Sequence, residues 1–321
     1  LAHCERALES IRQTGDFLDI GDLPVRLQLA RGHLYEALGM GNEALQSYQA
    51  AINGWQELDQ KTPGRFAVEL AGVWMNCGNV LRKWGAAPVL TEAVRAYDRC
   101  VTLLTGWTEK TNDHRNMLGG AWLNRGCTFH RIGGEAGLAE AVRSLDEAIT
   151  TLQPLADEHD PACRNLTFAW TNRGLVCLDR GDAASAVQAQ ERALAVSERL
   201  AVLLASERAG MTLNLAQARL VAADEAGALT AFHSVLASTS GSAESDPMAA
   251  DSAVQTRHAL AMILLRRLET SADADAETRI ELVAEVGDHV EDGLALIRRW
   301  EGRSGWFRES GVRLYELGAW L

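Results

Sequence analysis

The chain has 321 residues, of which 47% are hydrophobic and 23% are charged. This length and composition exclude a disordered chain and a small disulfide-stapled scaffold, because neither has enough apolar residues for a sizeable core. Acidic residues number 43 against 31 basic ones, and the net charge of -12 disfavours nucleic acid as a partner, since phosphates attract clustered Lys and Arg.

The sequence also disfavours a membrane as a partner. Its longest uninterrupted apolar run, residues 259–265, is far shorter than the roughly 18 residues that a membrane-spanning helix needs. The N-terminus has the pattern of an amphipathic helix and not that of a secretory leader. The six cysteines include no CxxC pair and mostly fall where a helix places a small apolar side chain. This pattern favours buried, reduced thiols and a cytoplasmic location.

A sequence frame repeats along the chain, and it determines the prediction of the fold. In chain order its copies begin at Gln28, Trp74, Trp122, Trp170 and Thr212. The three copies that begin with Trp read Trp-x-Asn-x-Gly, and consecutive ones are 48 residues apart. The first copy lacks the Trp and the last one is degraded, but both keep the order of large and small residues that follows.

Each copy predicts a pair of antiparallel helices. Trp74 and Gly78 share one stripe of a first helix, in which a Gly costs about 1 kcal/mol relative to Ala. That cost indicates that a neighbouring backbone or a bulky side chain comes close at this point. Gly85 suits the turn that ends the first helix, and Ala93 and Tyr97 begin the inward stripe of a second helix. A single helix pair leaves an apolar face exposed, which the next pair covers.

The residues Trp74, Gly78, Ala93 and Tyr97, with their counterparts in the other copies, resemble the tetratricopeptide repeat (TPR) family. The repeats of 42 to 48 residues are longer than the roughly 34 residues of an ordinary TPR, and they are similar to the extended-helix variants of kinesin light chains. The resemblance implies an all-α fold, a right-handed superhelical solenoid of antiparallel helix pairs. We expect the three extra residues between the helices of the second and third repeats to lengthen helices.

The whole chain, residues 1–321, is predicted to form one TPR-like solenoid. Its segments are a partial repeat at 1–20, repeats at 21–62, 63–110, 111–158, 159–202 and 203–240, a divergent repeat at 247–301, and a partial repeat or cap helix at 304–321. In the divergent repeat, Ile280, Val283, Val290 and Leu294 follow the spacing of one helical stripe. Partial repeats at both ends predict that the natural protein continues beyond them.

The sequence contains no nucleotide-binding loop, zinc-ligand cluster or nucleophile elbow, so it predicts neither an enzyme nor a bound metal or cofactor. Cys127 and His130 are three residues apart on one predicted helix, but no third group orients the imidazole and the repeat frame explains both positions. The acidic loop 157–160 has the groups to bind a cation, although a solvated turn is the simpler interpretation. Three tryptophans at helix ends or in loops are candidates for a protein interface: Trp84, Trp107 and Trp306.

A row of asparagines is the main candidate for binding. Asn76, Asn124, Asn172 and Asn214 stand two residues after the first frame position, about 200° around the helix from the Trp stripe. The resemblance implies that the first helices line a concave groove in which such an Asn grips the main chain of an extended peptide. An amide donates and accepts together, as a peptide unit requires. Alternatively, each Asn bonds the neighbouring repeat and only maintains the stack, and the sequence fits both readings.

Basic residues accompany this row in the early repeats. Asn79 and Lys83 follow on the same face of the second repeat, and Arg131 follows in the third. This positive charge favours an acidic or carboxylate-bearing ligand. Arg125 and Arg173, one residue before the frame Gly, either join the patch or bridge adjacent helices.

The sequence therefore predicts a non-catalytic scaffold that binds a partner protein or an extended peptide. Its peptide-binding residues are predicted to be Asn76, Asn79, Lys83, Asn124, Arg131, Asn172 and Asn214. The alternative is the sensor or regulatory region of a larger protein, such as a peptidase or a signalling NTPase, and the partial repeats at both ends favour it. If the asparagines hold a peptide, their amides are expected to lack protein partners.

Overall fold

The computed structural model describes residues 1–14, 21–107, 110–200, 202–270, 275–300 and 308–320. These residues form helices joined by short turns, and no β-strand occurs among them, so the all-α prediction is confirmed. The chain divides into two compact units, Leu1–Val176 and Cys177–Leu321. Within the residues described, no helix combines the length and apolar character that crossing a membrane requires.

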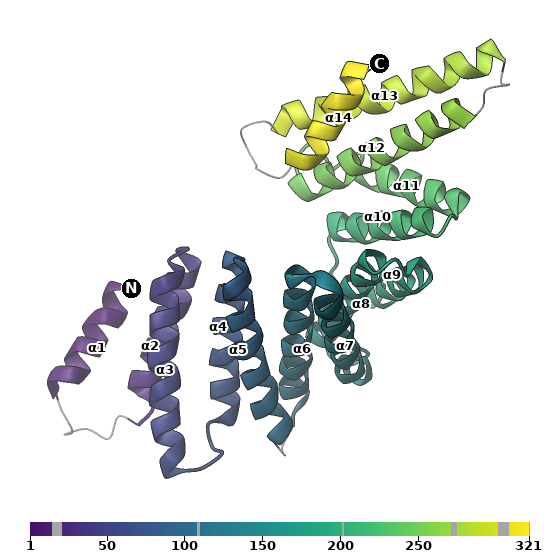
Figure 1. The fold of residues 1–321 in the computed structure, drawn as a ribbon. Helices are drawn as coiled ribbons and strands as arrows, with labels where there is room; N and C mark the ends of the chain where they lie inside the picture. The colour runs from purple at the N-terminus through teal and green to yellow at the C-terminus, as the bar shows by residue number, and fades with distance from the viewer. Residues whose placement is uncertain (15–20, 108–109, 201, 271–274, 301–307, 321) are drawn as a thin grey trace. The chain divides into compact units, whose positions relative to one another are not determined.

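The first unit consists of stacked helix pairs. Its helices are α1 (Ala2–Thr14), α2 (Leu23–Ala37), α3 (Gly41–Lys61), α4 (Ala67–Trp84), α5 (Ala87–Gly106), α6 (Asn112–Ile132), α7 (Gly134–Leu152) and most of α8 (Asp160–Asp179). Helices α2 and α3, α4 and α5, and α6 and α7 pack as antiparallel pairs, and each pair packs against the next (Figure 1). We call α2, α4, α6 and α8 first helices, and α3, α5 and α7 second helices.

The second unit continues the same kind of pairing. Its helices are α9 (Ala183–Ser197), α10 (Ala205–Val221), α11 (Glu225–Thr239), α12 (Pro247–Thr270), α13 (Ala276–Trp300) and α14 (Arg308–Trp320). Helix α10 pairs with α11, α12 pairs with α13, and α14 packs on both α12 and α13. The divergent repeat predicted at 247–301 thus contains the two longest helices of this unit, α12 and α13.

The frame glycines lie where a bulky side chain of the second helix packs against the backbone of the first. A Cβ atom added at Gly78 would lie 2.6 Å from the Tyr97 ring, and one at Gly126 would lie 2.7 Å from Cγ of Leu145. Both separations are too short for real atoms, so only glycine leaves room for the bulky residue of the second helix. The close approach predicted from the sequence is confirmed.

The glycines that end the first helices adopt backbone conformations that other residues avoid. The φ angles of Gly85, Gly133 and Gly181 are 72°, 72° and 77°. Helices α5 and α7 begin directly after the first two of these turns, at Ala87 and Gly134. The three extra residues of these repeats are therefore helical, as expected, and do not form a longer loop.

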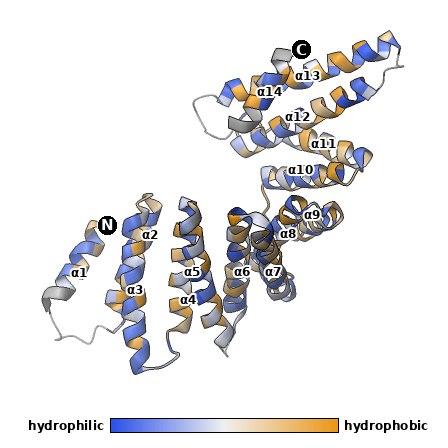
Figure 2. Ribbon diagram, in the orientation of Figure 1, coloured by the Kyte–Doolittle hydropathy of each residue, from blue (hydrophilic) through white to orange (hydrophobic). Residues whose placement is uncertain are grey.

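Apolar residues alternate with polar ones along the helices (Figure 2), and the apolar faces form the cores of the pairs. In the first unit, Tyr48, Ile52 and Trp55 of α3 are almost fully buried. In the second unit, one prediction is only partly correct. Val290 and Leu294 of α13 are buried, but Ile280 and Val283 are 69% and 44% exposed, because the described neighbours do not cover the start of this helix.

Candidate functional site

Six of the predicted binding residues lie on one face of the first helices of the first unit. This first-helix face comprises Asn76, Asn79 and Lys83 of α4, Asn124 and Arg131 of α6, and Asn172 of α8. All six side chains are partly or fully exposed. The spacing of three, four and seven residues keeps the members from one helix on the same side of that helix. Asn214 is on α10 in the second unit and is partly exposed there.

The three asparagine amides of the repeat frame each use one donor within the protein. The Nδ2 group of Asn76 lies 2.9 Å from Nε2 of His33, and that of Asn124 donates to Oδ1 of Asn79 at 3.2 Å. Asn172 donates to the carbonyl oxygen of Phe168, one turn earlier in its own helix, at 2.8 Å. The expectation of amides without protein partners is therefore wrong for the donor groups. Their Oδ1 atoms have no hydrogen-bond partner among the described residues.

Asn79 has a different role from the other asparagines. Its Oδ1 atom accepts from both the Tyr97 hydroxyl, at 2.9 Å, and Asn124, so that it joins two consecutive repeats. A second pair of amides, Asn165 and Asn116, forms a similar bridge at 2.9 Å between α8 and α6. Sequence reasoning missed this pair because the two residues occupy different positions of the repeat frame.

The two cations of the first-helix face differ in their contacts. Arg131 donates from Nη1 to the carbonyl oxygen of Arg82 at the end of α4, where a positive charge stabilises the helix dipole. Lys83 is exposed and forms no ion pair with the residues that the structure describes. Lys83 is therefore the more available cation for a ligand.

Arg125 and Arg173 bridge adjacent helices, which is one of the two roles that the sequence allows for them. Arg125 of α6 donates from Nε to Asp98 of α5, and Arg173 of α8 donates in the same way to Asp146 of α7, each at 2.7 Å. Each guanidinium also lies over the frame Trp of its own helix, 5.4 and 5.8 Å from the ring centroid. These arginines therefore belong to the Trp side of the first helices and not to the first-helix face.

Other groups that the sequence suggests for chemistry have structural environments. Burial raises the pKa of Cys127 to about 11, which keeps its thiol protonated and poorly nucleophilic near neutral pH. In the acidic loop 157–160, His159 lies 2.9 Å from Asp113 and accepts from the backbone N–H of Ala162 at 3.2 Å. No group of three His, Cys, Asp or Glu side chains able to hold a metal ion occurs among the described residues.

The candidate interface tryptophans also have protein contacts. Trp84 is 41% exposed, and its ring lies against Gly41 at the start of α3. Trp107 is edge-on to His114, with 6.4 Å between ring centroids. Trp306 lies outside the described residues.

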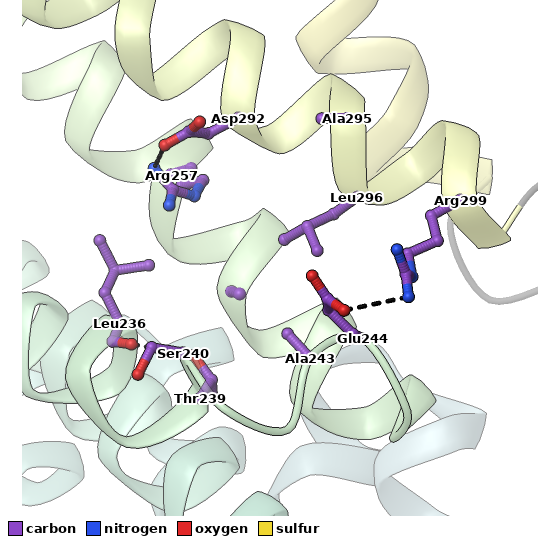
Figure 3. A pocket seen from close by; sticks show the side chains of 11 residues that line it. Leu236, Thr239, Ser240, Ala243, Glu244, Arg257, Asp292, Ala295, Leu296 and Arg299 are labelled. Atoms are coloured by element: carbon purple, nitrogen blue, oxygen red, sulfur yellow. Dashed lines mark hydrogen bonds and ion pairs between the residues drawn. The ribbon is translucent and has the colours of Figure 1, made fainter.

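A hollow of about 360 Å³ opens in the second unit between α11, α12 and α13. Figure 3 shows an ion pair at each end of it, with Leu296 between them. Arg257 Nη1 lies 2.7 Å from Oδ2 of Asp292, and Arg299 Nη2 lies 3.0 Å from Oε2 of Glu244. Since each cation has its own carboxylate, the hollow carries no preference for a ligand of one charge.

Neither a protein-family model nor a curated protein sequence matches the chain. Solved structures do. The apo form of RapI is 10% identical, with a TM-score of 0.58 over 92% of this chain and 97% of its own. BtubC (BKLC) from P. vanneervenii is 18% identical, with a TM-score of 0.56 over 72% of this chain and 85% of its own.

Repeats of a Podosopora anserina protein described as a putative kinesin light chain with TPR-like repeats are also similar. They are 15% identical, with a TM-score of 0.52 over 68% of this chain and 95% of their own. Identities this low establish the fold alone. The chain has a TPR-like helical-repeat fold, and the resemblance to the TPR and kinesin light chain repeats that the sequence predicts is confirmed at that level.

Proposed function

We propose that the first-helix face of the first unit binds an extended segment of a partner protein, without catalysis. The supporting observation is that Asn76, Asn124 and Asn172 recur on consecutive first helices with their Oδ1 atoms unpartnered among the described residues. Each Nδ2 group is held by one contact within the protein, so the orientation of the amide is set before a ligand arrives. A preoriented carbonyl accepts from the main-chain N–H of a peptide at little entropic cost.

Space beside the amides also supports this proposal. Gly72 precedes Asn76 by one turn on the same face, and a Cβ added there would have no neighbour within 4 Å. Gly120 precedes Asn124 in the same way, and its added Cβ would meet only the Asn165 amide at 3.7 Å. Packing within the protein does not require these glycines, although each costs about 1 kcal/mol in a helix. An approaching peptide main chain would require them.

The charge of the ligand follows from the cations at one end of the face. Lys83 and Arg131 are both exposed residues, and Arg131 also donates to the carbonyl oxygen of Arg82 at the end of α4. We expect a carboxylate or an acidic side chain of the partner at this end, with an affinity that falls as salt rises. All six cysteines are unpaired thiols, which supports a reducing compartment such as the cytoplasm for this role.

The test uses a displayed peptide library selected against the whole chain. Selected peptides are then titrated by fluorescence anisotropy into the native chain and into Asn76→Ala/Asn172→Ala. Two lost main-chain hydrogen bonds at about 1 kcal/mol each predict that the variant binds about thirtyfold more weakly. N-methylation of the contacting peptide bonds should weaken binding in the same range, because it removes the N–H groups that donate to the Oδ1 atoms.

Three further variants make the test specific. Asn53→Ala changes an exposed asparagine on second helix α3 and should leave binding unchanged. Gly72→Leu should weaken binding while the protein stays folded, since it fills only open space. Lys83→Glu should weaken acidic peptides more than neutral ones. Peptides that bind the double Asn variant as tightly as the native chain, or a library that yields no binder, would contradict the proposal.

A further inference from the structure

A hollow of about 530 Å³ lies on the opposite side of α4 from Asn76. It is bounded by the second helices α3 and α5, and its apolar wall includes Trp74, Leu81 and Leu45. Its volume is within the range of small-ligand and side-chain pockets. The Trp side of the first helices therefore carries a cavity as well as the core contacts of the frame.

The next repeat explains the presence of this hollow. There, Arg125 fills the same position: it reaches Asp98, lies 3.4 Å from Glu140, donates to Ser144 and stacks 4.7 Å from the centroid of the Phe129 ring. In the repeat frame, Arg125, Asp98, Glu140, Ser144, Trp122 and Phe129 correspond to Cys77, Gln49, Glu92, Ala96, Trp74 and Leu81. All six of these equivalents line the hollow. The hollow is thus the space that an arginine occupies one repeat later.

The replacements make this space more apolar than its counterpart. Cys77 stands in place of the arginine, Gln49 in place of its aspartate and Ala96 in place of its serine. A different arginine contacts the frame Trp here, from the rim of the hollow. The guanidinium of Arg99 lies 5.8 Å from the centroid of the Trp74 ring. Arg99 is exposed and has no ion pair among the described residues, whereas the other rim cation, Arg95, pairs with Glu92.

We propose that this hollow binds an apolar side chain of a partner segment that carries an acidic residue next to it. The apolar side chain would replace the missing arginine against Trp74 and Leu81. The adjacent carboxylate would pair with Arg99, which gives the rim one positive charge in excess. An apolar anchor inside a polar rim is the usual arrangement of the residues that dominate a protein interface. This proposal concerns a different side of α4 and does not rest on the proposed function of the first-helix face.

The test places an arginine at position 77, where the next repeat has Arg125. In Cys77→Arg/Gln49→Asp, the new guanidinium is expected to take the position of Arg125 with an aspartate partner, so the chain should fold and the hollow should be filled. The probes are the acetylated peptides Glu-Glu-Leu-Glu-Glu, Glu-Glu-Ala-Glu-Glu, Lys-Lys-Leu-Lys-Lys and Glu-Glu-Arg-Glu-Glu. Binding is measured from the indole N–H signal of Trp74, which is assigned by its loss in Trp74→Phe.

The Leu peptide with glutamates should shift the Trp74 signal in the native chain. The Ala peptide should bind about tenfold more weakly, since it loses most of the apolar area of the anchor. Arg99→Glu, a change of an exposed side chain, should reverse the preference between the acidic and the basic Leu peptides. The filled variant should show no response to any peptide.

Three results would overturn the proposal. The first is no response of Trp74 in the native chain, and the second is an equal response in the filled variant when both are folded by circular dichroism. The third is tighter binding of the Arg peptide than of the Leu peptide, which would show that the hollow still selects a guanidinium.

Discussion

The Nε group of Arg125 lies 2.7 Å from Oδ1 of Asp98, and the two residues belong to consecutive helix pairs. The guanidinium is only 15% exposed and also meets Glu140 and Ser144 of its own pair. One side chain thus joins three helices, α5, α6 and α7. Contacts between repeats, and not only those within a pair, depend on it.

We predict that Arg125→Met lowers the free energy of unfolding by about 1 to 3 kcal/mol, because it removes hydrogen bonds to charged groups and leaves carboxylates without their partner. Urea unfolding measures the change. Arg143→Met is the matched control, since Arg143 also pairs with Glu140 but is 70% exposed. Its effect should be close to zero. Equal effects of the two substitutions would show that the bridge contributes nothing to stability.

A second prediction concerns the close approach at Gly126. Gly126→Leu should cost about 1 to 3 kcal/mol through overpacking, because even its Cβ would lie 2.7 Å from Leu145 and 3.2 Å from the carbonyl oxygen of Ala141. Gly72→Leu makes the same chemical change where no atom lies within 4 Å. That control should leave stability unchanged or raise it by up to about 1 kcal/mol. Thermal unfolding of both variants separates packing from helix propensity.

A third prediction concerns acid stability of the second unit. Burial, and next the charge of Arg257, lowers the pKa of His289, while Glu285 and Asp292 act in the opposite direction and His233 adds to the lowering. Burial and Arg313 lower the pKa of His258 in the same way. The unfolded chain therefore binds more protons below the ordinary histidine pKa of 6.5, so stability is present above that value and is lost as the pH falls.

The measurement is urea unfolding from about pH 7.5 to about pH 5.5. In His258→Gln/His289→Gln, the loss of stability over this range should be smaller than in the native chain, because the two groups no longer titrate. Carboxylates contribute equally to both proteins and cancel in the comparison. Parallel pH curves for the two proteins would refute the prediction.

A fourth prediction concerns thiol reactivity. Burial raises the pKa of Cys77 and of Cys100 to about 12 and that of Cys127 to about 11. The buried thiols of Cys77 and Cys100 should react with iodoacetamide much more slowly than the partly exposed Cys4 in the folded chain. Peptide mapping by mass spectrometry measures the order, and urea should abolish it. Rapid labelling of Cys77 or Cys100 in the folded state would be inconsistent with a buried, protonated thiol.

The spacing of the frame predicted which faces of the two helices in a pair meet. At Gly78 and Gly126 it predicted close approach of either a backbone or a bulky side chain, and the structure places the side chains of Tyr97 and Leu145 there. Spacing says which residues share a face, but not whether another helix covers it. For that reason the exposure of Ile280 and Val283 could not be predicted from their periodicity.

The contacts of the candidate sites were harder to predict because they depend on side-chain direction across repeats. The same Asn frame position gives a bridge to Asn79 for Asn124 and a bond within its own helix for Asn172. The hollow did have a signal in the sequence. The residue before the frame Gly is Arg in three repeats, at Arg31, Arg125 and Arg173, and Cys77 in another, and a comparison of that position across repeats would have indicated missing volume.

The glycine turns at Gly85 and Gly133 have a consequence for how this protein tolerates changes in length. The three extra residues after each turn lengthen α5 or α7 at its N-terminus. Three residues correspond to about 300° of rotation around the helix axis, nearly one full turn. The inward stripe from Ala93 or Ala141 onward keeps its register with the preceding helix. An insertion of three residues at either turn is accordingly absorbed as nearly one helical turn. Because Arg131 contacts the Gly85 turn but the Gly133 turn has open space beside it, Gly133 is the suitable place to graft a reporter peptide.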